Sequence, residues 1–507
     1  VRLISASPTI SNSTISQNRI ALVTIETSNP AITNNLILYN QEFGVQNQNS
    51  AVIIDARNNW WGDPSGPYHS TNPDGLGNPV SDYVLFDPWH KSEPIPPIES
   101  SWLLMYYMAG DNEWIMSKVL WDELWDIRES NHPYADIAVF YDSEATGASY
   151  WYFPSDSDEF TKIDKGPLNT GNGITLQNFI NWAKTLSNAE NEALIISDHG
   201  HALKGFAKDS SESDDVVENK EFQISLSAVG GVDVIYMHVC LMANLDTMWE
   251  ISGLTEYYVA SESIAWLPKF HSSYIEYINS TTTSRELALS MAQNYYSATS
   301  KPTTISVIDM AFVNTVAERA HGLASSIRES SASTRLQIWT LIKSSDLQYF
   351  AEKWDENSFI PGKKRLVDLY NFALSVSVFS EVESAAISLL ETRDDFVIYN
   401  RFTSGKPYED KDEYWDHSNA TGVTVTLPPY RASFYVGTWL DFAQGADWDG
   451  ENYNKMNNYL DDFEYHWGPM VSELVLEFDP SSEEETVPPN PVSLGINYSF
   501  FLPLIVR

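Results

Sequence analysis

Two short segments of the chain place side chains suited to nucleophilic chemistry directly after apolar stretches. The stretch Ala193–Ser197 is followed closely by His199, and the stretch Val232–Met237 is followed by Cys240. A cysteine thiolate can attack a carbonyl carbon, and a nearby histidine can hold the ion pair and then protonate the leaving amine. Cys240 and His199 therefore form a candidate catalytic pair for acyl transfer.

The neighbours of this pair suit the same chemistry. Gly200 has no side chain, so its backbone N–H could approach an oxyanion on the substrate, and the Cys240 N–H could be a second donor. The segment LMANLDTMWEIS after Cys240 is typical of the start of a helix, whose dipole favours a thiolate. A single cysteine at a strand end is, however, usually a small buried apolar residue. The pattern by itself leaves a catalytic and a structural Cys240 open.

Strands alternate with amphipathic helices around these segments. Trp102–Met108 is a nearly continuous apolar run, as expected for a buried parallel strand, and Asn112–Ile127 carries apolar residues at helical spacing. The alternation continues with a strand, a helix and two further strands at Asp136–Tyr141, Leu176–Leu186, Ala193–Ser197 and Val232–Met237. This order predicts an α/β fold with a mostly parallel sheet flanked by helices. Active-site groups of such a sheet collect at the carboxyl ends of its strands.

The remaining part of the predicted domain, 101–476, is mainly helical. Helices are expected over Ser284–Ser297 and Thr315–Ser330, and a strand at GVTVTLP, from Gly422, belongs to the same domain. Residues 477–507 combine an acidic, proline-rich linker with a short apolar tail.

Residues 1–92 have a different character and predict an all-β unit. Short β-branched stretches alternate with Asn, Gly and Ser turns, as in a parallel β-helix whose corner asparagines stack. The alternative is the edge of a β-sandwich with Asn-rich loops. A proline-rich linker, 93–100, follows. The chain begins with Val1 in mid-pattern, so we expect it to be a piece of a longer protein.

The amino-acid composition excludes some classes of binding partner and some cellular locations. The 507 residues carry 69 acidic against 30 basic side chains, a formal net charge of −39, which disfavours binding to nucleic acid and anionic lipid. Cys240 is the single cysteine, so no intrachain disulfide forms, and no apolar run approaches the ~20 residues of a membrane span. Low use of cysteine fits either a reducing compartment or a bacterial protein exported without disulfides, and we expect the second, extracellular or on the cell surface.

The catalytic segments resemble those of the clostripain family of cysteine peptidases, relatives of caspases, gingipains and legumain. The resemblance rests on ALIISDHGH and VDVIYMHVCLMANLDTMWEISGLTEYYVASES, with Trp102–Asn112 similar to the family's first strand and the Asp-Asn after it. It implies a caspase-like sheet and an endopeptidase that cleaves polypeptides through a Cys240–His199 dyad and an acyl-enzyme. It implies no cofactor for the chemistry. Residues 58–89 resemble the last coil and cap of bacterial right-handed β-helix proteins, in Trp60-Trp61-Gly62, Gly66-Pro67 and Pro88-Trp89.

One position departs from the family pattern. The family usually has an Asp two residues before the cysteine, associated with binding a basic P1 side chain, and this chain has His238 there. His238 is therefore the expected substrate-binding residue, and a P1 preference other than Arg or Lys is expected.

An acidic loop follows the histidine segment and is a candidate calcium site, because hard cations bind several carboxylates. Its carboxylates are Asp209, Glu212, Asp214, Asp215 and Glu218. Some clostripain relatives depend on calcium, but a solvated surface loop explains the same residues. No set of Cys and His residues has zinc spacing, so no other metal is expected.

Two other functions stay open. An inactive peptidase-like domain in a surface adhesion or glycan-binding protein would explain His238 and the β-helix part, a fold often found in proteins that contact polysaccharide. A polysaccharide lyase or glycosidase in residues 1–92 is disfavoured, because too few coils remain to form a groove. A thiol-reactive peptidyl probe would separate an active peptidase from the inactive scaffold.

Overall fold

The computed structural model describes residues 1–478 except 12, 93–99, 113, 156, 158, 203–204, 345, 352–363, 410–413 and 428–466. The chain divides into two compact units, Val1–Ile98 and Glu99–Arg507. This boundary falls in the predicted linker, which lies almost wholly outside the described residues, as does the predicted C-terminal tail.

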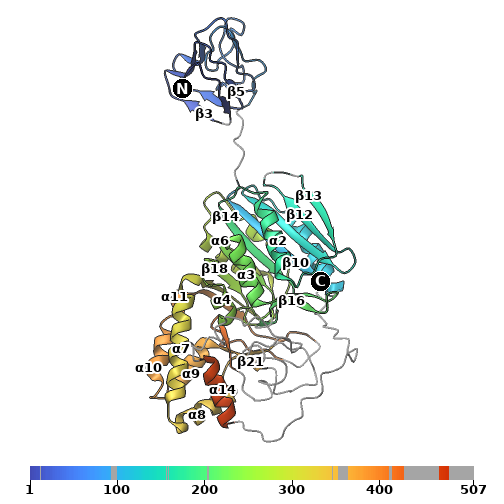
Figure 1. The fold of residues 1–507 in the computed structure, drawn as a ribbon, viewed down its shortest axis with the longest axis vertical. Helices are drawn as coiled ribbons and strands as arrows, with labels where there is room; N and C mark the ends of the chain where they lie inside the picture. The colour runs from blue at the N-terminus through green and yellow to red at the C-terminus, as the bar shows by residue number, and fades with distance from the viewer. Residues whose placement is uncertain are drawn as a thin grey trace. The chain divides into compact units, whose positions relative to one another are not determined.

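The N-terminal unit consists of short strands whose ladders are all parallel (Figure 1). Three sheets have the strand orders β1-β4-β7, β2-β5-β8-β9 and β3-β6. The strands are β1 (Arg2–Ile4), β2 (Thr9–Ser11), β3 (Thr14–Ser16), β4 (Ile20–Ile25), β5 (Ala31–Thr33), β6 (Leu36–Leu38), β7 (Phe43–Asn47), β8 (Ile54–Asp55) and β9 (Val84–Leu85). A β-sandwich built from antiparallel hairpins would not have this pairing.

Asparagine side chains at the corners of this unit bond to one another across successive strands. Asn35 Nδ2 donates to Asn59 Oδ1 at 3.0 Å, and Asn40 Nδ2 donates to Asn78 Oδ1 at 2.8 Å. These four side chains are buried, so each amide group needs a partner inside the protein. The stacked asparagines supply those partners where the chain turns.

The second unit is built on a nine-stranded sheet with the order β13-β12-β11-β10-β14-β17-β18-β19-β22 (Figure 1). Its five central strands run parallel, and antiparallel strands extend it on both sides. The central strands are β11 (Ala135–Ser143), β10 (Trp102–Gly110), β14 (Asn191–Ser197), β17 (Val234–His238) and β18 (Tyr257–Ala260). The flanking strands are β12 (Ala148–Phe153), β13 (Thr161–Gly166), β19 (Thr303–Asp309) and β22 (Val397–Thr403). The predicted parallel centre is confirmed.

Helices cover both faces of this sheet. Apolar residues of α2 (Gly173–Lys184), α3 (Asn219–Val229) and α4 (Leu245–Glu250) pack on one face. On the other face lie α1 (Trp114–Glu129), α5 (His271–Ile275) and α6 (Ser284–Ala298). Every residue of β10 is buried, because both faces of that strand are covered.

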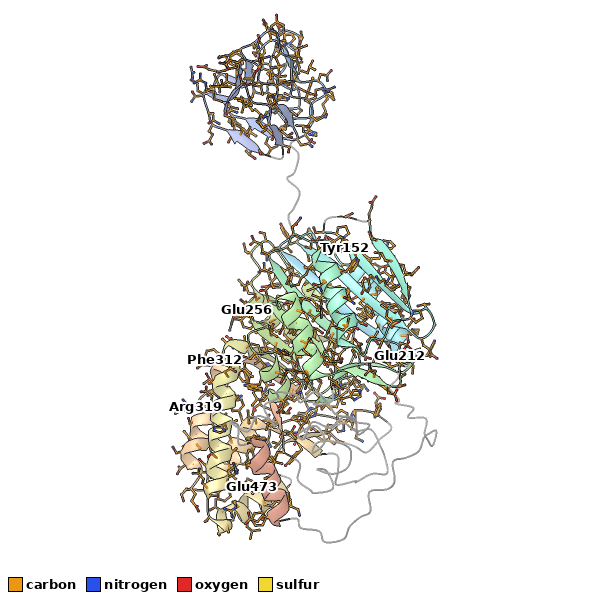
Figure 2. All side chains as sticks on the ribbon, viewed as in Figure 1. Tyr152, Glu212, Glu256, Phe312, Arg319 and Glu473 are labelled. Carbon is orange, nitrogen blue, oxygen red and sulfur yellow. The ribbon has the colours of Figure 1, made fainter. Side chains whose placement is uncertain are left out.

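A second layer of elements follows in the chain. A three-stranded sheet joins β20 (Tyr349–Ala351), β21 (Lys364–Asp368) and β23 (Thr424–Thr426), so the strand predicted at Gly422 lies in a separate sheet. The helices of this part are α7 (Val313–Glu329), α8 (Ala332–Ile342), α9 (Leu369–Val376), α10 (Glu383–Leu390), α11 (Arg393–Phe396) and α14 (Trp467–Phe478). Helix α14 lies beside α7 (Figure 1). Arg328 of α7 pairs with Glu473 of α14, which is labelled in Figure 2.

Candidate active site

The two predicted catalytic residues follow neighbouring parallel strands. Strand β14 ends at Ser197 and β17 ends at His238, and these two residues are partners in the ladder. His199 and Cys240 each lie two residues further along, at the same edge of the sheet. This is the arrangement that the alternation of strands and helices predicts.

The backbones of Gly200 and Cys240 are packed directly against each other. A Cβ atom on Gly200 would lie 2.2 Å from the Cys240 carbonyl oxygen and 2.9 Å from its nitrogen. Both distances are far below van der Waals contact, so only glycine fits at position 200 without a shift of the backbone. The segments carrying His199 and Cys240 are therefore held in contact by the main chain itself.

The chain turns sharply after Cys240. Leu241 has a φ of 64°, in the left-handed region that branched and bulky residues rarely adopt. The Leu241 N–H donates to the Ser263 carbonyl at 3.0 Å, and its side chain is buried beside Ala202 and Phe350. These contacts hold the strained turn that presents Cys240.

The helix expected directly after Cys240 begins later than predicted. Helix α4 starts at Leu245 and is capped by Asn244, whose side chain accepts from the Thr247 N–H at 2.9 Å. Cys240 lies outside its first turn, and the effect of a helix dipole falls off within that turn. The expectation that this dipole stabilises a thiolate is therefore wrong.

His199 is partly buried beside a lysine. Burial of the imidazole and the positive charge of Lys208 lower the pKa of His199 to about 4. The ring is therefore neutral at pH 7 and can accept a proton. The preceding Asp198 is buried and accepts from Asn112 Nδ2 at 2.5 Å and from the Lys208 N–H at 2.6 Å. Burial raises the pKa of Asp198 well above its usual range.

His238 does not line an open pocket. Its side chain is 0% exposed, and strand alternation turns it to the same face as Tyr236, whose ring stacks on it at 5.4 Å. Its Nε2 lies 2.9 Å from the Trp266 carbonyl and its Nδ1 lies 3.8 Å from Glu123 Oε1. Burial lowers the pKa of His238 to about 4. The expected substrate contact would require an exposed ring, and this placement does not provide one.

The loop after β18 forms one wall beside Cys240 through Ala265, a residue that the sequence did not single out. The Ala265 carbonyl lies 3.9 Å from Cys240 Sγ, within reach of a weak S–H hydrogen bond. The next residue, Trp266, is buried and held by Tyr295, whose hydroxyl accepts from the Trp266 N–H at 2.9 Å. The sequence marks only the start of this loop, Ser261-Glu262-Ser263, which belongs to the segment that resembles the family, and it gives no sign that Ala265 and Trp266 lie beside Cys240.

The carboxylates of the predicted calcium loop do not converge on one point. Glu212 is exposed at the surface (Figure 2), Asp214 pairs with Lys208 at 2.8 Å, and Asp215 accepts from Asn169. Glu218 serves in the capping box of α3. The predicted grouping is wrong, because backbone turns and local partners separate these side chains.

Two other clusters contain groups that could bind a metal, each built from residues far apart in the sequence. Asp209 of the loop meets Asp111 after β10 and Asp142 in β11, and the second cluster joins Glu123, His238 and His271. Ligand atoms within each cluster lie within 4.8 Å of one another. Among the described residues, groups able to bind a metal thus also occur away from the acidic loop, formed by residues that no spacing in the sequence connects.

In the acidic cluster of Asp111, Asp142 and Asp209, the pKa of Asp142 is shifted far from its ordinary value. Burial of Asp142 and the nearby negative charges of Asp111 and Asp209 raise its pKa to about 8. A hydrogen bond from the Ser143 N–H lowers this pKa but does not offset the rise. Asp142 is 1% exposed, and its Oδ2 atom has no hydrogen-bond partner among the described residues. A buried carboxyl group of this kind is stable only when it is protonated or bound to a cation.

A sequence model of the Clostripain family matches residues 106–459, which include His199 and Cys240. The chain belongs to the clostripain family. It is a cysteine-type peptidase, and the family generally needs no cofactor for its chemistry. A comparison with curated protein sequences gave no match.

Solved structures share the fold of this clostripain-family chain. An inactive zymogen C11 protease from Parabacteroides distasonis has a TM-score of 0.54 at 16% identity, covering 68% of this chain and 97% of that one. A secreted C11 cysteine protease from Bacteroides thetaiotaomicron, in complex with an irreversible peptide inhibitor, has a TM-score of 0.51 at 15% identity. That match covers 65% of this chain and 93% of the other. Among the described helices of the present chain, none is both long and apolar enough to cross a bilayer.

Proposed function

We propose that this protein is an endopeptidase in which Cys240 is the nucleophile and His199 transfers the protons. The Cys240 thiolate attacks the scissile carbonyl, and the resulting oxyanion is bound by the N–H groups of Gly200 and Cys240. His199 takes the thiol proton and returns it to the leaving amine as the C–N bond breaks. Water then hydrolyses the acyl-enzyme, with His199 as the base, and the thiol is regenerated.

The contact between Gly200 and Cys240 is the observation that carries this proposal. It brings two backbone N–H groups and the two reactive side chains to one edge of the parallel sheet. The His199 imidazole is neutral at pH 7 and can accept the thiol proton, although burial and the charge of Lys208, which lower its pKa to about 4, also make it a weaker base.

A thiol-reactive peptidyl probe tests the proposal. Because Cys240 is the single cysteine, covalent thiol labelling reports on this residue alone. We expect rapid labelling of the folded protein, none of Cys240→Ser, and much slower labelling of His199→Ala. Labelling of the folded and urea-unfolded protein at the same rate would contradict an activated thiol.

We propose in addition that the enzyme lacks a strong preference for Arg or Lys at P1. Position 238 offers no carboxylate, and the His238 ring is buried. Lys208 lies near His199, and its ammonium group is paired with Asp214 at 2.8 Å, so this carboxylate is not free for a cationic side chain. A cationic P1 side chain would therefore lack the pairing carboxylate at position 238 that would otherwise stabilise it.

We also propose calcium binding at Asp111, Asp142 and Asp209. The orphaned Asp142 Oδ2 atom supports this site, since a hard cation bound by carboxylates would compensate its burial. Calcium here would stabilise the ends of β10 and β11 and take no part in the chemistry. A rise in melting temperature with calcium that disappears in Asp142→Asn would support it.

For the N-terminal unit we propose the end of a right-handed parallel β-helix, supported by its parallel ladders and stacked asparagines. Such a unit, joined to a polyanionic peptidase with one cysteine, suits a protein that acts outside a bacterial cell, where the unit could contact polysaccharide. Glycan-array binding by the full chain, compared with a chain lacking residues 1–92, tests this contact.

A further inference from the structure

Three side chains from distant segments converge inside the second unit, on the face of the sheet covered by α1, α5 and α6. Glu123 belongs to α1, His238 ends β17 and His271 begins α5. Their side chains are 3%, 0% and 0% exposed. Glu123 Oε1 is in direct contact with His271 Nε2 and lies 3.8 Å from His238 Nδ1. The proposed catalysis does not use any of these three groups.

The outer nitrogen of each imidazole is already hydrogen-bonded. His238 Nε2 must carry a proton, because its partner at 2.9 Å is the Trp266 carbonyl, which only accepts. His271 Nδ1 lies 2.5 Å from the Tyr274 hydroxyl, which can accept from it while donating to Tyr106 at 2.6 Å. In this tautomer of both rings, the unprotonated nitrogens are His271 Nε2, in contact with Glu123 Oε1, and His238 Nδ1, 3.8 Å from the same oxygen.

This pattern is the one that metal-binding histidines show. A histidine that binds a metal through one nitrogen almost always donates its other N–H to a carbonyl, carboxylate or similar acceptor, which orients the ring. His238 has a carbonyl in this role, and His271 has a tyrosine hydroxyl. Each ring is thus held with its second nitrogen on the side of the same carboxylate, and His238 Nδ1 also lies 3.5 Å from the Ser197 hydroxyl, a weak contact that a bound ion would replace.

The cluster also has polar atoms that nothing satisfies. Among the described residues, Glu123 Oε2 and the Tyr236 hydroxyl have no hydrogen-bond partner, although both are buried. A buried ionised carboxylate is costly unless it is paired and fully bonded. A divalent cation would compensate the carboxylate and give the orphaned atoms a partner.

We propose that Glu123, His238 and His271 form a structural site for one borderline divalent transition metal ion, for which Zn²⁺ is the best fit. Two imidazole nitrogens and one carboxylate oxygen are an established type of zinc ligand set, with a water or the Tyr236 hydroxyl completing the tetrahedron. Ligand atoms about 2.0–2.1 Å from zinc lie roughly 3.3 Å from each other. The ion would therefore open the direct Glu123–His271 contact and draw His238 slightly inward.

The metal site would affect the active site only by fixing the position of the residues beside Cys240. His238 holds the Trp266 carbonyl, and the adjacent Ala265 carbonyl lies against Cys240 Sγ. A bound ion would fix His238 and thus the wall beside Cys240. The inference goes beyond the proposed peptidase mechanism and does not depend on it.

The test uses the full chain carrying Cys240→Ala, so that zinc cannot bind at the proposed catalytic pair. The protein is expressed with zinc, passed over a chelating resin and analysed by plasma mass spectrometry. We expect about one zinc ion per chain, and Co²⁺ exchanged into the site should give the visible absorption of a tetrahedral ion. Adding Glu123→Gln, which keeps the shape of the side chain, should remove at least ~90% of the bound zinc, and His271→Gln should do the same.

Two controls separate this site from other ligands. His132→Gln changes a buried histidine outside the cluster, whose Nδ1 bonds to the Ala135 carbonyl, and Asp142→Asn changes the acidic cluster. Both should retain the zinc. A folded protein that carries no zinc, shows no tetrahedral Co²⁺ spectrum and has a melting temperature indifferent to zinc would overturn the proposal. The cluster would then be a hydrogen-bonded ion pair.

Discussion

The Cα atom of Gly200 lies against the peptide group of Cys240, so closely that a Cβ atom there would be 2.2 Å from the Cys240 carbonyl oxygen. The residue after the proposed base thus touches the proposed nucleophile through main-chain atoms alone.

Gly200→Ala should therefore separate the two strand ends and misplace both oxyanion donors. We expect kcat/KM to fall by roughly 10²-fold, the cost of losing an oxyanion donor. Circular dichroism and thermal unfolding report whether the fold survives. Gly230→Ala is the matched control, since nothing lies within 4 Å of a Cβ there, although its φ of 85° adds strain. Activity near that of the unmodified protein in folded Gly200→Ala would count against the proposed oxyanion site.

Replacing His199 should remove the proton transfer while leaving the thiol in place. His199→Ala should lower kcat about 10²–10⁴-fold, the usual contribution of a general base. His321→Ala, in helix α7, should have little effect. Steady-state kinetics with one peptide substrate compare the two variants. Equal losses at both positions would mean that the wrong histidine has been chosen.

The raised pKa of Asp142 makes stability depend on pH. Its folded pKa of about 8 exceeds the unfolded value near 3.8, so between these values the folded protein holds a proton that the unfolded chain releases. The free energy of unfolding therefore falls as pH rises from about 4 to 8. Asp142→Asn cannot titrate and should flatten this fall, gaining roughly 1–3 kcal/mol at pH 8 over the unmodified protein.

Urea unfolding at pH 5 and pH 8, with a chelator present, measures the effect. Glu212→Gln is the control, because that side chain is exposed. Parallel pH profiles for Asp142→Asn and the unmodified protein would contradict the perturbed carboxyl.

Peptides that differ only at P1 test the specificity. We expect cleavage after Gln or Glu to match or exceed cleavage after Arg, because no carboxylate stands at position 238 to pair with a cationic P1 side chain. His238→Asp should not create an Arg preference. It would bury a second carboxylate beside Glu123 and should lower the melting temperature. A strong preference for Arg in the unmodified protein would refute the proposal.

Cutting the chain between 93 and 99 should leave the peptidase intact. The contact boundary between the two units falls there, and a unit with its own core usually folds alone. The fragment that begins near Ser100 should keep kcat/KM within about twofold of the full chain. An insoluble or inactive fragment would make the N-terminal unit part of the catalytic module.

Local patterns in the sequence determined which strands carry the candidate catalytic residues. The apolar runs of β10, β14 and β17 and the helices between them were readable, because buried parallel strands carry continuous apolar residues. His199 and Cys240 follow adjacent strands of that pattern. Their placement at one edge required only the order of the strands.

Tertiary packing decided which side chains surround those strand ends. The face to which His238 turns depends on the register of β17, and its partners Glu123 and His271 come from helices that pack there only in the folded protein. The acidic cluster likewise joins Asp209 to residues at the ends of β10 and β11. Contacts between segments so far apart cannot be predicted from periodic patterns in the sequence, because they depend on how the helices pack against the sheet.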